Sequence, residues 1–276
     1  MNSPSTHRLA VIQLAAAAAL WSMGGLLIKL IPWPAFAITC VRSLIAAIVI
    51  FIFIKPKRLK FTKSEFLAAF FYCCTVTLFI TSTKLTTAAN AVFLQYTAPI
   101  YVAFLAYWFL NEIPTKLDIA VVVVVIFGMG LFFKDQISTD GMTGNILAII
   151  SGVTFASLTV VLRSQKDASP LHSIFLGNLM TAIFLSPFAL TAPALDPMSV
   201  FRLTILGVFQ LGLSYILYSK GVKYVAAVET MLISMIEPIF NPIWVLLLVG
   251  ERPTMGAILG GTIIIAAIAF RNFKTA

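Results

Sequence analysis

The sequence predicts an all-α integral membrane protein with ten transmembrane helices, organised as two inverted five-helix repeats. Three observations support this prediction: the composition, the lengths of the apolar stretches and an internal repeat. Hydrophobic residues make up 60% of the 276 residues, charged residues only 11%, and the mean hydropathy is +1.01. A soluble domain has about 25% charged residues. This chain therefore has too few polar side chains to cover a surface that faces water on all sides.

Ten apolar stretches follow one another along the chain, each close to the roughly 17–25 residues that a helix needs to cross a bilayer. They cover residues 9–30, 34–54, 64–83, 86–110, 117–133, 144–163, 170–190, 199–219, 225–249 and 255–270. The first follows His7 and Arg8 and so resembles a signal peptide, but at about 22 residues it is longer than the apolar region of such a peptide. We interpret it as the first transmembrane helix.

The loops between these stretches are short and predict no soluble domain. The polar connection at 134–144 lies at the middle of the chain and divides it into two halves, residues 1–138 and 139–276. With the N-terminus inside, thirteen of the 19 Lys and Arg residues lie on the cytoplasmic side, five lie on the other side, and Arg42 lies within a span. Basic residues accumulate in cytoplasmic loops. We therefore expect a multi-pass protein of the plasma (inner) membrane with both termini in the cytoplasm.

The same loops account for the net charge of +9. The basic residues form only short clusters between spans, which does not favour nucleic-acid binding. The three cysteines lie inside apolar stretches and the two histidines at their edges, without the spacing of a metal site. We expect neither a metal nor another cofactor.

The two halves of the chain resemble each other when one is shifted by 139 residues. The shift aligns Lys84 with Lys223, Ala88 with Ala227, Pro99 with Pro238, and Glu112-Ile-Pro114-Thr115 with Glu251-Arg-Pro253-Thr254. A weaker match at a shift of 134 aligns Trp21 with Phe155. Because five spans per half is an odd number, the second half must insert upside down. Inverted repeats are common in secondary transporters, whose site lies near the midplane; the alternative is a duplication retained for packing alone.

Glu237 is the first candidate for a functional residue. It lies near the middle of an apolar stretch, where a carboxylate costs roughly 2.5–3.5 kcal/mol to insert. It could carry a proton that drives transport, bind an amino group of a substrate, or serve only as a structural partner for Arg42. Glu229 is the other acidic residue within an apolar stretch and a second candidate for proton coupling. Ser234 and Asn241 share a helical face with Glu237 and are expected to point into a cavity or the bundle interior.

Arg42 and Trp21 are candidates in the first two spans. Arg42 could hold an anionic group such as a carboxylate, extend toward the interface or pair with Glu237. Trp21 lies well inside its span rather than in the interfacial belt where Trp is common, which favours a place in a cavity wall.

Further candidates lie in the fourth, eighth and ninth spans. The candidate cavity residues there are Asn90, Phe93, Gln95, Tyr96, Gln210 and Tyr215. For the polar ones, hydrogen bonding between helices without substrate contact is the alternative. Pro99, Pro238 and Pro242 are expected to break their helices, which is tolerated where the backbone lines a cavity or is buried in protein; a bend needed only for packing is the alternative.

These features resemble the EamA-type branch of the drug/metabolite transporter superfamily. The residues that carry the resemblance are Leu20-Trp21-Ser22 with Lys29, Arg42, the segment from Thr86 to Pro99, Glu112-Ile-Pro114 and the segment from Glu237 to Pro253. The resemblance covers residues 9 to 270. It implies a basket of ten helices around a central cavity that works by alternating access. Members commonly export amino acids, other metabolites or drugs.

We therefore expect a secondary transporter, an exporter of a small metabolite such as an amino acid or a related amphipathic compound. Its partners would be the lipid bilayer and the small-molecule substrate. The chain has no Walker-type phosphate loop and no HExxH motif, so neither ATP-driven transport nor an intramembrane metalloenzyme is indicated. A passive channel or membrane scaffold is the main alternative, and an intramembrane enzyme is a weaker one. Gly256 and Gly260 allow close helix packing within one chain or between protomers, so monomer and homodimer both stay open.

Overall fold

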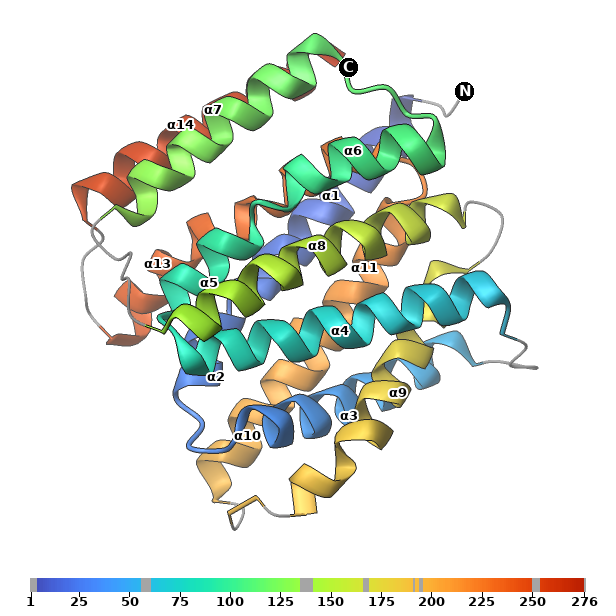
Figure 1. Cartoon of the computed structure of the whole chain (residues 1–276), viewed down its shortest axis with the longest axis vertical. Helices are drawn as coiled ribbons and strands as arrows, with labels where there is room; N and C mark the ends of the chain where they lie inside the picture. Colours follow the sequence, from blue (N-terminus) through green and yellow to red (C-terminus); the bar gives the residue numbers. More distant parts are fainter. Residues whose placement is uncertain are drawn as a thin grey trace.

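The computed structural model describes residues 4–55, 61–134, 141–165, 169–190, 192–193, 196–249 and 254–275. Within these residues the regular structure is entirely helical (Figure 1). The elements are α1 (Pro4–Trp21), α2 (Gly24–Lys29), α3 (Ala35–Ile54), α4 (Lys63–Leu85), α5 (Ala88–Gln95), α6 (Ala98–Leu110), α7 (Lys116–Phe133), α8 (Met142–Ser164), α9 (Pro170–Leu190), α10 (Pro197–Ile205), a π-helical segment η1 (Leu206–Leu213), α11 (Ser214–Gly221), α12 (Ala227–Ser234), α13 (Ile236–Val249) and α14 (Met255–Thr275).

The all-α membrane architecture is confirmed, although the number of long spans is smaller than predicted. Among the described residues, eight helical segments are long and apolar enough to cross a membrane, and a shorter apolar stretch covers Ile258–Arg271 in α14. The predicted ninth span, 225–249, is divided into an 8-residue helix and a 14-residue helix, so neither part alone reaches a bilayer's thickness.

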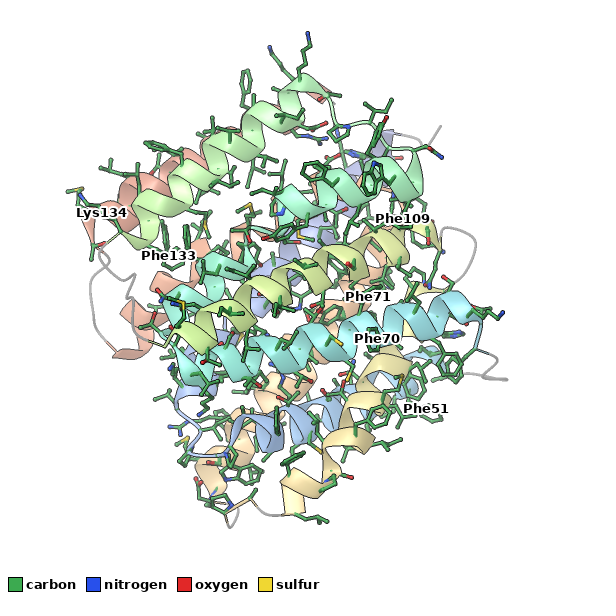
Figure 2. The ribbon with its side chains drawn as sticks, viewed as in Figure 1. Phe51, Phe70, Phe71, Phe109, Phe133 and Lys134 are labelled. Carbon is green, nitrogen blue, oxygen red and sulfur yellow. The ribbon has the colours of Figure 1, made fainter. Side chains whose placement is uncertain are left out.

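The surface of the bundle is covered with large apolar side chains. Phe51, Phe70 and Phe109 are 47%, 52% and 71% exposed and project outward from α3, α4 and α6 (Figure 2). Soluble monomers rarely expose contiguous apolar patches larger than a few hundred Å². Lipid tails are the environment in which such a surface is stable.

Three of the membrane segments are interrupted partway along their length. The first is interrupted at Ser22–Met23, the fourth at Tyr96–Thr97 and the ninth at Met235. The last two interruptions lie just before Pro99 and Pro238. A proline has no N–H, so the carbonyl four residues earlier, that of Gln95 or Ser234, loses its helical donor.

Pro242, in contrast, does not break its helix. The helix α13 continues through this position to Val249, which corrects the prediction of a break there. The loss of one backbone hydrogen bond can bend a membrane helix without ending it, because local adjustments satisfy the freed carbonyl.

The helices of the two halves pack in matched pairs. The helix α3 lies along α9, and α7 lies along α14, as Figure 1 shows for α7 and α14 at one side of the bundle. The helix α4 packs along α8, and α1 packs along α11. In a duplicated chain, each of the first five segments corresponds to the segment five places later, so α4 corresponds to α11 and α1 to α8. The α4–α8 contact is then equivalent to the α11–α1 contact. The α3–α9 and α7–α14 pairs are each made of two equivalent segments. This packing is that of a duplicated arrangement.

Candidate functional site

A small polar cavity lies where the interrupted segments meet. Its lining residues are Trp21, Arg42, Thr75, Val76, Phe79, Gln95, Phe155, Gln210, Leu211, Tyr215 and Glu237. The unfilled space amounts to about 380 Å³, of which only about 40 Å³ admits the centre of a water molecule. One water needs roughly 10–15 Å³ by that measure. The cavity therefore has room for only a few waters in this conformation.

Six of the residues selected from the sequence line this one cavity: Trp21, Arg42, Gln95, Gln210, Tyr215 and Glu237. They come from six different elements, α1, α3, α5, η1, α11 and α13. The helix interruptions bring them together, because Trp21 and Gln95 each end a helix at its break and Glu237 follows the break at Met235. Gln210 lies in the π-helical segment, a rare geometry that is frequent at functional sites.

Glu237 is held by Tyr96. The Tyr96 hydroxyl lies 2.5 Å from Glu237 Oε2 and 3.0 Å from the backbone carbonyl oxygen of Ser234. Tyr96 is 2% exposed and caps the C-terminus of α5, so one phenol joins the interruption of the fourth segment to that of the ninth. Tyr96 thus belongs to the site through its contact with Glu237.

Arg42 is fully buried on α3 and is held by a neutral partner. Its Nη1 donates to Gln210 Oε1 at 3.0 Å, and its Nε has no hydrogen-bond partner among the described residues. Gly24 leaves the space for this amide, since a Cβ there would lie 2.8 Å from Gln210 Nε2. No ion pair between Arg42 and Glu237 is found within the described part of the chain. The two ionisable side chains therefore line the same cavity without pairing.

Aromatic rings and a hydrogen-bonded amide complete the wall. The Trp21 ring lies 5.0 Å from the rings of Tyr215 and Tyr218 and 5.8 Å from that of Phe155, between ring centroids. Gln95 of α5 donates through Nε2 to Ser151 Oγ of α8 at 2.7 Å. The cavity thus combines two charges, two amides and a large aromatic surface.

Three candidates from the sequence lie away from the cavity. Asn90 is in the first turn of α5, where its Nδ2 donates to Thr86 Oγ1 and Asn145 Oδ1. The Phe93 ring packs on Phe133 with centroids 5.9 Å apart. The Ser234 hydroxyl donates to the carbonyl of Thr230 at 2.9 Å, so this residue reaches the site through its backbone carbonyl and not through its side chain. The side chains of Asn241 and Pro242 lie outside the described ones.

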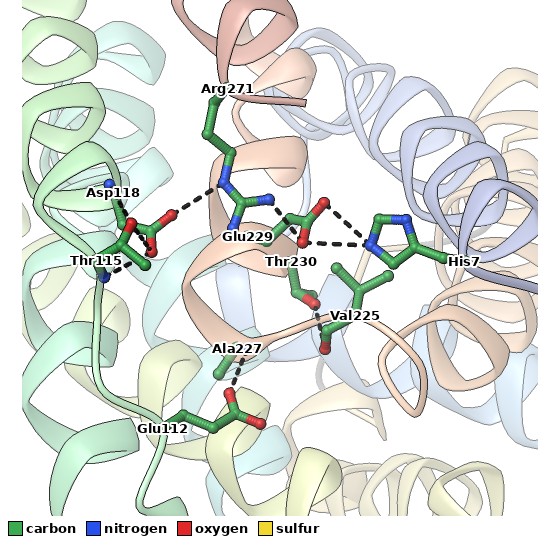
Figure 3. Close-up of polar contacts among 9 residues, drawn as sticks. All are labelled: His7, Glu112, Thr115, Asp118, Val225, Ala227, Glu229, Thr230 and Arg271. Atoms are coloured by element: carbon green, nitrogen blue, oxygen red, sulfur yellow. Dashed lines mark hydrogen bonds and ion pairs between the residues drawn. The ribbon is translucent and has the colours of Figure 1, made fainter. Parts of the chain in front are cut away.

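Glu229 also lies away from the cavity, in an ion cluster that joins α1, α7, α12 and α14 (Figure 3). Its Oε2 is 2.6 Å from Arg271 Nη1, and its carboxylate is 3.4 Å from His7 Nε2. Arg271 Nε also pairs with Asp118 Oδ1 at 2.9 Å, and Asp118 caps α7 through Thr115. These partners explain why a carboxylate is tolerated in an apolar stretch. The role of Glu229 in proton coupling stays a prediction. His7 and Arg271 also bring both termini to the same end of the molecule.

Several cavity residues were not selected from the sequence: Thr75, Val76, Phe79, Phe155 and Leu211. A signal was present for Phe155, because the weaker repeat match at a shift of 134 aligns it with Trp21. For Thr75 the available signal was a run of hydroxyl residues in the third apolar stretch, which also includes Thr77, Thr81 and Ser82. The apolar members carry no signal that distinguishes a cavity wall from a lipid-facing surface.

A multi-pass helical bundle with a cavity of polar and aromatic residues at its helix interruptions is an architecture suited to a membrane transporter. The chain belongs to the EamA-like transporter family of the drug/metabolite transporter superfamily, whose family model matches residues 8–134 and again residues 142–273. This is a family of non-enzymatic transporters.

Individual relatives agree with this membership. The chain is 27% identical over 201 residues to an uncharacterized transporter of Archaeoglobus fulgidus, covering 72% of this chain and 73% of that one. It is 26% identical over 223 residues to the uncharacterized transporter YwfM of Bacillus subtilis, covering 76% and 75%. A solved crystal structure superimposes with a TM-score of 0.81 over 96% of both chains at 15% identity, which shows the shared fold.

Proposed function

We propose that this transporter exports a small metabolite, such as an amino acid or a related amphipathic compound, by alternating access. The observation that carries the proposal is the placement of Arg42 and Glu237 on one cavity without an ion pair between them. An amino acid carries a carboxylate that suits a guanidinium and an ammonium that suits a carboxylate. A zwitterion bound between the two residues would satisfy both charges at once.

The energetics favour this arrangement over a purely structural one. A buried charge without a charged partner costs several kcal/mol, and the fold could have avoided that cost by pairing Arg42 with Glu237. Instead, Arg42 is hydrogen-bonded to Gln210 and Glu237 to Tyr96. Functional sites are where such costly arrangements are retained. Glu237 is also placed to gain and release a proton, which would couple export to protons.

The architecture we propose has ten spans in two inverted repeats, residues 1–138 and 139–276, around a central cavity. Its support is the 139-residue sequence shift, the matched packing of the two halves and the equivalent interruptions before Pro99 and Pro238. We also propose the plasma (inner) membrane with both termini cytoplasmic. The contacts of His7 and Arg271 with Glu229 support placing both termini on one side, and the excess of basic residues supports the cytoplasmic side.

The test is a thermal-shift screen of the purified protein against free amino acids, followed by counterflow in proteoliposomes with any compound that binds. A ligand present at about 100 times its Kd stabilises the folded state by about 2.7 kcal/mol, which raises the unfolding temperature measurably. A binder should lose most of its shift when its carboxylate is amidated. No shift with any amino acid, for protein that unfolds cooperatively, would contradict the proposed substrate class.

Variants of the two charged residues separate their roles. We expect Arg42→Met and Glu237→Gln each to weaken binding of the identified amino acid by at least about tenfold, the loss of one charge-assisted contact worth roughly 1.5–3 kcal/mol. Lys220→Met is the matched control, because the Lys220 ammonium lies over the Phe53 ring and not in the cavity. Binding unchanged in both cavity variants would show that the substrate does not bridge the two charges.

A further inference from the structure

The Tyr96 hydroxyl lies within hydrogen-bond distance of two acceptors. Its Oη lies 2.5 Å from Glu237 Oε2 and 3.0 Å from the carbonyl oxygen of Ser234. A phenol has one O–H to donate. Both contacts can be full hydrogen bonds at the same time only when Glu237 is protonated and donates its own O–H to Tyr96 Oη. When Glu237 is ionised, the phenol proton is drawn to the carboxylate, and the Ser234 carbonyl loses it.

The Ser234 carbonyl is the one that depends on this proton. In a continuous helix its donor would be the N–H of residue 238, four positions later, but that residue is proline. Ser234 is the last residue of α12, and the helix resumes as α13 at Ile236. Tyr96 caps the C-terminus of α5 at the equivalent interruption of the other half. Its hydroxyl therefore determines whether the end of α12 is tied to the end of α5.

We propose that Tyr96 is a positioning residue that converts the protonation of Glu237 into a change at the α12–α13 interruption. With Glu237 protonated, Tyr96 donates to Ser234 and ties the two interruptions together. With Glu237 ionised, Tyr96 donates to the carboxylate and releases the end of α12, so that this joint can open. The proposal rests on the transport function inferred above, because it supplies the step by which a proton would change the shape of the cavity.

The charged and titratable groups that face Glu237 are few. Among the described residues they are Tyr96 from the α5–α6 interruption, Arg42 from α3 and Tyr215 from α11. Arg42 is hydrogen-bonded to Gln210, and Tyr215 packs against Trp21 and Tyr72. Tyr96 is the group that contacts both Glu237 and the backbone of the interruption.

Two substitutions should fix the hydrogen bond between Tyr96 and Ser234 in opposite states, permanently formed or permanently absent. Glu237→Gln replaces the carboxyl group with an amide that is a donor at every pH, so Tyr96 should stay on Ser234. Tyr96→Phe keeps the ring and removes the hydroxyl, so the Ser234 carbonyl should stay released. Tyr101→Phe is the matched control, because Tyr101 is a partly buried tyrosine of α6 whose hydroxyl contacts Thr97, whereas the Tyr96 hydroxyl contacts Glu237 and Ser234.

The experiment is hydrogen–deuterium exchange of the full-length protein in detergent without substrate, followed at residues 235–240 from about pH 5 to about pH 8. Rates are corrected for the intrinsic pH dependence of exchange. We expect protection in the wild type and in Tyr101→Phe to fall by about fivefold as pH rises, the equivalent of one hydrogen bond. Glu237→Gln should be protected throughout, and Tyr96→Phe and the double variant should be unprotected throughout.

Either single variant can overturn the proposal. A Tyr96→Phe protein that still changes its protection with pH, or a Glu237→Gln protein that is unprotected, shows that Tyr96 does not act as described. Because no substrate is present, these outcomes are independent of the thermal-shift screen. A working switch without amino-acid binding would contradict the proposed substrate and leave the role of Tyr96 standing.

Discussion

At the residue scale, the charges of the cavity are arranged by neutral groups. The Arg42 guanidinium is oriented by the amide of Gln210, and the Glu237 carboxylate by the phenol of Tyr96. Neutral partners satisfy hydrogen-bonding capacity without cancelling charge, so both side chains keep the ability to attract a substrate group of opposite sign. Gly24 contributes by the absence of a side chain, which admits the Gln210 amide.

Removing the Gln210 amide should leave the Arg42 charge without an acceptor. We expect Gln210→Leu to lower the free energy of unfolding by about 1–3 kcal/mol, the cost of an unsatisfied buried polar group. In an Arg42→Met background the same substitution should cost much less, because no buried charge is left to satisfy. Chemical unfolding of the four proteins in detergent measures this difference as a double-mutant cycle. Equal losses in both backgrounds would show that Gln210 stabilises the fold independently of Arg42.

At the element scale, the interruptions of the helices explain where the cavity lies. The breaks at Ser22–Met23, Tyr96–Thr97 and Met235, together with the π-helical segment, all border it. The first break is also tied to α13, because Trp244 Nε1 donates to Ser22 Oγ at 2.7 Å. Backbone groups freed in this way are tolerated within a membrane where they are buried in protein or line a cavity. The same joints are the positions at which short helices can reorient.

Restoring a backbone donor at one joint should therefore stiffen it. We expect Pro238→Ala to supply an N–H to the Ser234 carbonyl and join α12 to α13, since proline in a helix interior costs roughly 3 kcal/mol relative to alanine. Exchange at residues 235–240 should slow, and counterflow should fall. Pro242→Ala is the matched control, because α13 already continues through that position. Equal effects of the two substitutions would show that the interruption before Pro238 has no special role.

At the scale of the whole molecule, the membrane architecture could be predicted from the sequence, but the placement of individual polar residues could not. The lengths of the apolar stretches are set by bilayer thickness, a constraint on each segment separately. Pro238 predicted a break in the ninth segment, but the segment was counted as one span because hydropathy is averaged over residues on both sides of the break. Pro242 has the same local chemistry, and only the surrounding packing shows that the helix continues there.

The distances of Glu229 and Asn90 from the cavity have a common cause. Glu229 and Glu237 are both carboxylates in one apolar stretch, and hydropathy treats them alike. The structure separates them by partners distant in sequence: Glu229 meets Arg271 and His7, and Glu237 meets Tyr96. Asn90 and Glu229 each lie in the first turn of their helix, away from the interruption. Gln95, which lies next to a break, lines the cavity.

The ion cluster around Arg271 should hold one end of the bundle together. Arg271 joins Glu229 on α12 to Asp118 on α7, and all three side chains are at most 8% exposed. Arg271→Met would leave two buried carboxylates without their cation, so we expect a loss of about 3–5 kcal/mol in the free energy of unfolding. Lys274→Met on the same helix, whose ammonium lies over the Phe270 ring, should cost less than about 1 kcal/mol. Adding Glu229→Gln and Asp118→Asn to Arg271→Met should recover part of the loss, because the uncompensated charges are then gone. A triple variant as unstable as Arg271→Met would mean that α14 is held by the packing of the arginine stem and not by its charge.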